Sequence, residues 1–118
     1  MKSIIIIGNK DLLIDKIEEI EFNGFAEMHR VEEKKLLTLE FSSGRVYFNY
    51  DEDIALDYEQ DELDRISMKN PRFIAINFSS IEALKKVLSE LYIFDGLLVD
   101  DDHGNIVDLN TYMVNMQI

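Results

Sequence analysis

A run of carboxylates in the middle of the chain is the feature with the most chemical potential. From Asp51 to Asp64, eight of fourteen residues are acidic and none is basic. Carboxylates held close together can act as general acid and base, can bind cations, or can attract a basic partner. The eight residues are Asp51, Glu52, Asp53, Asp57, Glu59, Asp61, Glu62 and Asp64.

No catalytic set forms around this run. The chain has no cysteine, two histidines and no glycine-rich phosphate loop. The segment Asn9–Asp11 is similar to part of a guanine-reading motif, but Leu12 stands where that motif needs aspartate. A base, an orienting group and an oxyanion donor cannot be assigned together. We therefore expect a protein that is not an enzyme and that needs no cofactor.

A second acidic run, Asp100 to Asp102 followed by His103, offers ligands for a metal. It does not fit a calcium loop, because placing Gly104 sixth puts Val99 first and Asn110 twelfth. Neighbouring strand residues point to opposite faces, so several ligands from this run require a distorted loop. A regulatory or metal-binding domain that uses Asp100–His103 is the alternative function, and a polar hairpin turn is the simpler interpretation.

Tyrosines beside the first run favour a binding surface. Aromatic side chains supply anchor area at interfaces, and carboxylates steer and bond Arg and Lys. The net charge of −12, from 24 acidic and 12 basic residues, disfavours nucleic acid and anionic membranes as partners. A solvated face is the competing interpretation, since charge runs usually are one.

We therefore expect the main contact with a basic partner between Tyr50 and Asp64, including Tyr58, and a secondary contact at the second acidic run. That secondary contact comprises Asp100, Asp101 and Asp102. The oligomeric state does not follow from the sequence.

The hydrophobic pattern predicts one α+β domain over residues 1–118, with helices packed on a mostly antiparallel sheet. The clearest signal is a hairpin in which apolar and polar residues alternate on both sides of Ser42–Gly44. The acidic run itself contains five apolar residues, so it is not purely solvated. Expected strands cover 3–7, 26–31, 35–41, 45–50, 72–78, 96–100 and 106–107, and expected helices cover 10–20, 61–67, 79–91 and 111–116.

Short polar residues indicate where three of these helices begin. Asn9 can cap the first helix, and Asp108 or Asn110 the last. Ser79 with Glu82 matches a capping box at the start of the third. At the N-terminus, the apolar run of four isoleucines is too short for a signal peptide or a membrane span. Together with the absence of cysteine, this leads us to expect a cytoplasmic protein.

The last fifty residues show a pattern met elsewhere. The strand "FIAINF" leads into the helix "FSSIEALKKVLSEL", and "GLLVDDDHGNIVDLNTYM" follows with a strand, an acidic turn, a return strand and a helix. This resembles the small immunity proteins of bacterial contact-dependent inhibition and other polymorphic toxin systems. The resemblance implies a cytoplasmic inhibitor that covers the active-site cleft of one cognate toxin domain, often a nuclease. No residue role is carried over from that group.

Overall fold

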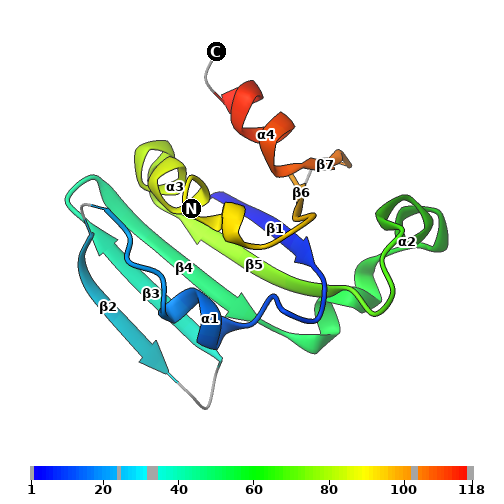
Figure 1. Cartoon of the computed structure of the whole chain (residues 1–118), viewed down its shortest axis with the longest axis horizontal. Helices are drawn as coiled ribbons and strands as arrows, with labels where there is room; N and C mark the ends of the chain where they lie inside the picture. Colours follow the sequence, from blue (N-terminus) through cyan, green and yellow to red (C-terminus); the bar gives the residue numbers. More distant parts are fainter. Residues whose placement is uncertain (1, 24, 32–34, 102–103, 117–118) are drawn as a thin grey trace.

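The computed structural model describes residues 2–23, 25–31, 35–101 and 104–116. A seven-stranded antiparallel sheet runs through them in the order β2-β3-β4-β5-β1-β6-β7 (Figure 1). The predicted α+β class with a mostly antiparallel sheet is therefore confirmed. The strands are β1 Lys2–Gly8, β2 Phe25–Val31, β3 Leu36–Phe41, β4 Gly44–Tyr50, β5 Arg72–Phe78, β6 Leu98–Asp100 and β7 Ile106–Asp108. The α-helices are α1 Ile14–Glu18, α2 Gln60–Ile66, α3 Ile81–Leu88 and α4 Leu109–Met116, and the 3-10 helices are η2 Glu52–Asp57 and η3 Leu91–Ile93.

The main core lies between one face of the sheet and helices α1, α3 and α4. Alternate residues of each strand point into it, as the period of two requires. In β3 and β4 these are the apolar residues that the hairpin pattern predicted, among them the fully buried Leu37, Leu39 and Phe48. The alternation in the sequence therefore identified the inward face of this hairpin correctly.

The opposite face of the sheet is covered at one end by η2 and α2. Ile7 and Phe73 are buried there against Ile66, in a second and smaller core. Because β1 has a core on each side, its side chains alternate between two apolar layers, with Ile4 and Ile6 in the main core. This explains why β1 is a continuous run of isoleucine instead of an alternating pattern.

Two of the predicted helix caps are wrong, and one is confirmed. Asn9 closes a tight turn, accepting a hydrogen bond from the Asp11 backbone at 2.8 Å, so α1 begins only at Ile14. The cap of α3 is Ser80, whose hydroxyl accepts from the Ala83 backbone at 3.1 Å. Ser79, the residue predicted for that role, instead accepts from the Arg45 backbone at 2.8 Å.

The hairpin between β3 and β4 depends on Gly44, which follows the two turn residues Ser42 and Ser43. A Cβ atom at this position would lie 2.6 Å from Ser80 Oγ and 2.7 Å from Ser79 Oγ. Both serine hydroxyls already hold the start of α3 against the hairpin, because Ser80 Oγ donates to the Ser43 carbonyl at 2.6 Å. Only glycine fits this close approach.

Asp108 caps α4, as the sequence predicted. Its carboxylate accepts from the Thr111 backbone at 2.7 Å and from the Thr111 hydroxyl at 3.0 Å. These hydrogen bonds from Thr111, led by the backbone one, hold the pKa of Asp108 below its usual 3.8.

This cap makes a testable contribution to stability against pH. Because the folded pKa is depressed, the carboxylate stabilises the fold above its unfolded pKa, and this contribution is lost as the pH falls through the folded pKa. We expect Asp108→Asn to lower the urea midpoint at pH 7, and the difference from the wild type to shrink below about pH 4. Urea unfolding at several pH values measures this. A difference that stayed constant down to pH 2 would contradict the assignment.

None of the helices in the described part of the chain has the length and apolar character needed to cross a membrane.

Candidate functional site

The acidic run folds into two short helices, η2 and α2, which we call the acidic ridge (residues 51–64). Four of its carboxylates shape this local structure. Asp51 caps η2 by accepting from the Asp53 backbone at 2.9 Å. Glu59 and Glu62 form a capping box at the start of α2, with the Glu59 backbone donating to Glu62 at 3.0 Å. Asp64 accepts from the Gln60 side chain at 2.9 Å.

Negative charge at these positions suits the helices. Acidic residues in the first turn of a helix complement its macrodipole and its unpaired backbone N–H groups. Glu52 and Asp53 lie in the first turn of η2, Asp61 and Glu62 lie in the first turn of α2, and Asp51 and Glu59 are the N-cap residues. Part of the charge density is therefore explained by capping and by the helix dipole, a role that the sequence pattern alone did not indicate.

The remaining carboxylates of the ridge face solvent. In the described residues, the side chains of Asp53, Asp57 and Asp61 have no hydrogen-bond or ion-pair partner. Glu52 is also exposed, with Lys35 Nζ 3.8 Å from its carboxylate. These four exposed carboxylates lie on η2 and α2, and α2 projects from one end of the molecule (Figure 1).

An apolar underside fixes the ridge to the sheet. Ile54, Leu63 and Ile66 pack in the small second core. The Tyr58 ring lies 4.8 Å from the Phe73 ring, and its hydroxyl donates to Asp100 Oδ2 at 2.6 Å. The acidic run is therefore an ordered, amphipathic cover, and not a loop that spreads its charges apart.

The bond from Tyr58 also joins the two acidic runs. Asp100 is 8% exposed and lies on β6, opposite Ile5 of β1. Asp101 accepts from the backbone and the side-chain amide of Asn105, at 3.2 Å and 2.9 Å. Both carboxylates therefore bond to other parts of the fold, and Asp102 lies outside the described residues.

Three of the residues expected to contact a partner are placed differently from that expectation. Asp100 is buried, and Tyr58 is half-buried with its hydroxyl turned toward it, so neither presents a free side chain. Tyr50 packs against the main core, on the face of the sheet opposite the ridge. Strand alternation explains this, since Tyr50 follows Phe48 by two residues and shares its face.

The ridge also carries one exposed apolar residue. Leu56, in η2, is 80% exposed and lies between the solvent-facing carboxylates Asp53 and Asp57 along the chain. The pattern of five apolar residues in the run gave no signal that one of them faces outward.

The alternative metal site at Asp100–His103 is only partly within the described residues. His103, like Asp102, lies outside them, while Asp100 and Asp101 accept the hydrogen bonds given above. Elsewhere in the described chain, one group of three possible ligands is formed by Glu27, His29 and Glu40, with ligand atoms within 4.8 Å of one another. They lie on the polar face of β2 and β3.

That group already contains its own counterion. Arg45 Nε lies 2.8 Å from Glu40 Oε1, and His29 Nε2 lies 2.9 Å from Glu27 Oε1. A guanidinium beside one ligand repels a metal cation.

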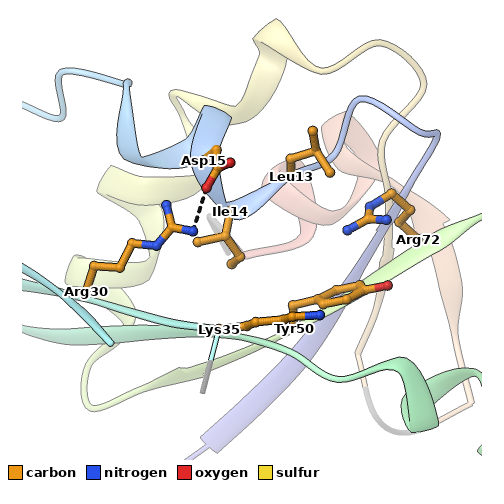
Figure 2. A pocket seen from close by; sticks show the side chains of 7 residues that line it. All are labelled: Leu13, Ile14, Asp15, Arg30, Lys35, Tyr50 and Arg72. Carbon is orange, nitrogen blue, oxygen red and sulfur yellow. Dashed lines mark ion pairs between the residues drawn. The ribbon is translucent and has the colours of Figure 1, made fainter. Parts of the chain in front are cut away.

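A cavity of about 200 Å³ lies beside α1, and no pattern in the sequence predicted it. Three of its lining residues are basic, namely Arg30 from β2, Lys35 before β3 and Arg72 from β5 (Figure 2). Tyr50 lies below the Arg72 guanidinium, and the apolar Leu13 and Ile14 line the other side (Figure 2). The three basic residues come from separate positions in the sequence, so no local motif predicts the cavity.

Comparison with protein-family models, curated proteins and solved structures finds no match for this chain.

Proposed function

We propose that this chain is a binding protein that inhibits a basic protein partner through the acidic ridge, as an immunity protein neutralises its cognate toxin. The observation that carries the proposal is the exposure of Asp53, Asp57 and Leu56 on η2 and of Asp61 on the neighbouring helix α2. It combines unpaired negative charge with an apolar side chain in one ordered place.

The solvent-facing carboxylates suit recognition of Arg and Lys. Charge-assisted hydrogen bonds to carboxylates are stronger than neutral ones, and complementary charge speeds association. Because the described chain supplies no partner for Asp53, Asp57 or Asp61, all three can bond a partner without breaking an internal contact.

The exposed leucine suits the centre of such a contact. A single apolar side chain on a surface is common, but one that is 80% exposed on a fixed helix with acidic neighbours along the chain can insert into a pocket of a partner. The small core beneath the ridge holds η2 in place, so little conformational entropy is lost when the partner binds.

A basic nuclease domain is the partner that this surface fits best. Its cleft is built to hold phosphates, so spaced carboxylates on a rigid surface can compete with nucleic acid there. The chain itself then acts by binding and not by catalysis.

Co-expression with the toxin domain encoded by the adjacent reading frame tests the proposal. We expect the chain to restore growth of cells that produce the toxin domain, and the purified proteins to form a complex whose affinity falls with salt. The proposal would be overturned if the toxin domain still stopped growth in the presence of this chain and calorimetry detected no complex between the two proteins. If the adjacent reading frame encoded no toxic domain, that result would count against the proposed inhibition of a toxin.

Leu56 provides a sharper test of the contact. We expect Leu56→Ala to weaken the complex by at least about tenfold, as for an interface anchor, with little change in thermal stability. The matched control is Ile93→Ala, which truncates another aliphatic side chain, 67% exposed, outside the ridge. Calorimetric titration of both variants with the toxin domain gives the comparison. Equal affinity of the two variants would exclude Leu56 from the interface.

A further inference from the structure

We infer that the cavity beside α1 is a binding site for a small oxyanion, a phosphate or the carboxylate of a small acid, held by Arg72 and Lys35. This site meets the acidic ridge at the pair of Lys35 with Glu52, but it does not depend on the function proposed above. It rests on how the basic side chains that line the cavity are paired.

Arg72 is fixed but not neutralised. Its Nε donates to the Leu12 carbonyl at 2.8 Å, and its guanidinium lies 4.4 Å from the centre of the Tyr50 ring. These contacts use one of its five N–H donors. Within the described residues, the other four have no acceptor, and no carboxylate pairs with Arg72.

The lack of a carboxylate partner within the described residues distinguishes Arg72 from the other two basic residues that line the cavity, Arg30 and Lys35, which both have one. Arg30 pairs with Asp15 and with Glu18, so it closes one side of the cavity as a neutralised group. Asp15 is the one acidic residue among the described residues that line the cavity.

Lys35 adds a second cation on the same aromatic ring. Its Nζ lies 5.1 Å from the centre of the Tyr50 ring, while its ion pair with Glu52 is long, at 3.8 Å. A distance of 3.8 Å exceeds that of a hydrogen bond, so the ammonium keeps donors for a ligand. Tyr50 therefore contacts two of the basic residues that line the cavity.

The geometry restricts the ligand class. The planar guanidinium presents paired N–H donors, which match two oxygens of a carboxylate or phosphate. In Figure 2, Arg72 and Arg30 approach the cavity from opposite sides, with Leu13 and Ile14 above Tyr50. A volume of about 200 Å³ is below the 300–1,000 Å³ typical for larger ligands, so the site fits a small anion with little apolar content.

The net charge of −12 argues against anion binding in general, and this makes the proposal specific. The long-range field repels any anion, so binding requires the local arrangement of Arg72 and Lys35. At physiological salt the repulsion is screened beyond about 8 Å, and the short-range contacts remain.

Titration of the full chain with inorganic phosphate and, separately, with succinate tests the site, both at constant ionic strength. Two-dimensional NMR follows the Arg72 Nε–H signal and the backbone signals of Lys35 and Tyr50. We expect saturable shifts confined to the cavity for at least one anion. The anion with the lower dissociation constant shows whether the site prefers a phosphate or a carboxylate group.

Matched variants separate a site from general charge effects. We expect Arg72→Gln to weaken binding by about tenfold or more, and Arg72→Lys to weaken it less, because the charge remains while the paired donors are lost. Arg65→Gln removes the same charge from an exposed position on α2 and is expected to leave affinity unchanged.

The Arg72 variants lose the hydrogen bond to the Leu12 carbonyl, so a second variant is needed in case they do not fold. Lys35→Gln leaves that bond in place, and we expect it to weaken anion binding several-fold. The proposal is overturned if neither anion gives saturable shifts, or if Arg65→Gln weakens binding as much as Arg72→Gln.

Discussion

Replacing Asp53, Asp57 and Asp61 together with lysine is expected to slow association with the basic partner by about ten- to a hundredfold at low salt. The three carboxylates face solvent and take no part in the capping bonds of the ridge. Reversing them removes attraction without removing a structural contact. The melting temperature is therefore expected to change little, because the decrease of repulsion within the ridge is offset by lysine at Asp53 and Asp61 in the first turns of η2 and α2.

The matched control reverses Glu19, Glu21 and Asp95, three exposed acidic residues outside the ridge. Both triple variants carry the same net charge, so any difference between them depends on position. Stopped-flow association rates at several salt concentrations measure the effect. If both variants slow association equally, only the total charge of the chain matters and the ridge is not the interface.

Tyr58→Ala is expected to destabilise the fold by about 3 to 4 kcal/mol. The substitution removes a ring from the small core and leaves the buried Asp100 carboxylate without the hydroxyl that donates to it at 2.6 Å. Tyr58→Phe keeps the ring, so about 2 kcal/mol is expected for it. Urea unfolding monitored by circular dichroism gives both values.

The consequence of losing Tyr58 should be local. The ridge is attached to the sheet through the small core, while β3 and β4 pack in the main core. We expect amide hydrogens of residues 52–66 to exchange much faster in Tyr58→Ala, and those of β3 and β4 to keep most of their protection. Tyr92→Ala, at an exposed position, is the control and should change stability by less than about 0.5 kcal/mol. Uniformly faster exchange would show that the ridge does not open as a separate unit.

Much of the fold followed from the sequence because it depends on local pattern. The alternation in residues 36–50 predicted a hairpin with Leu37, Leu39 and Phe48 inward, and the structure confirms it. The pattern did not reveal that β1 lies between β5 and β6, because strand order is set by contacts between distant residues. Cap positions failed where two adjacent serines, Ser79 and Ser80, could each serve, and tertiary contact with the hairpin decided between them.

The candidate sites were less predictable than the fold. The acidic residues of the ridge were visible in the sequence, but their division into caps and free carboxylates depends on where η2 and α2 begin. Tyr50 was grouped with them by proximity in the chain, although strand geometry places it on the other face. The cavity was not foreseen, because it joins single residues such as Arg30 and Arg72 that only the sheet brings together.

The central position of β1 has a consequence for how the chain folds during synthesis. β1 pairs with β5 and with β6, so its second neighbour is made about ninety residues later. At typical translation rates of about 5–20 residues per second, Ile4–Ile7 remain without both partners for roughly 5 to 20 seconds. Both edges of this apolar strand are open to other nascent chains until β5 is made, and one edge stays open until β6 follows. Folding of this protein should therefore be slow, as expected for a sheet that depends on distant pairings, and its yield should fall sharply when chaperones that shield apolar segments are depleted.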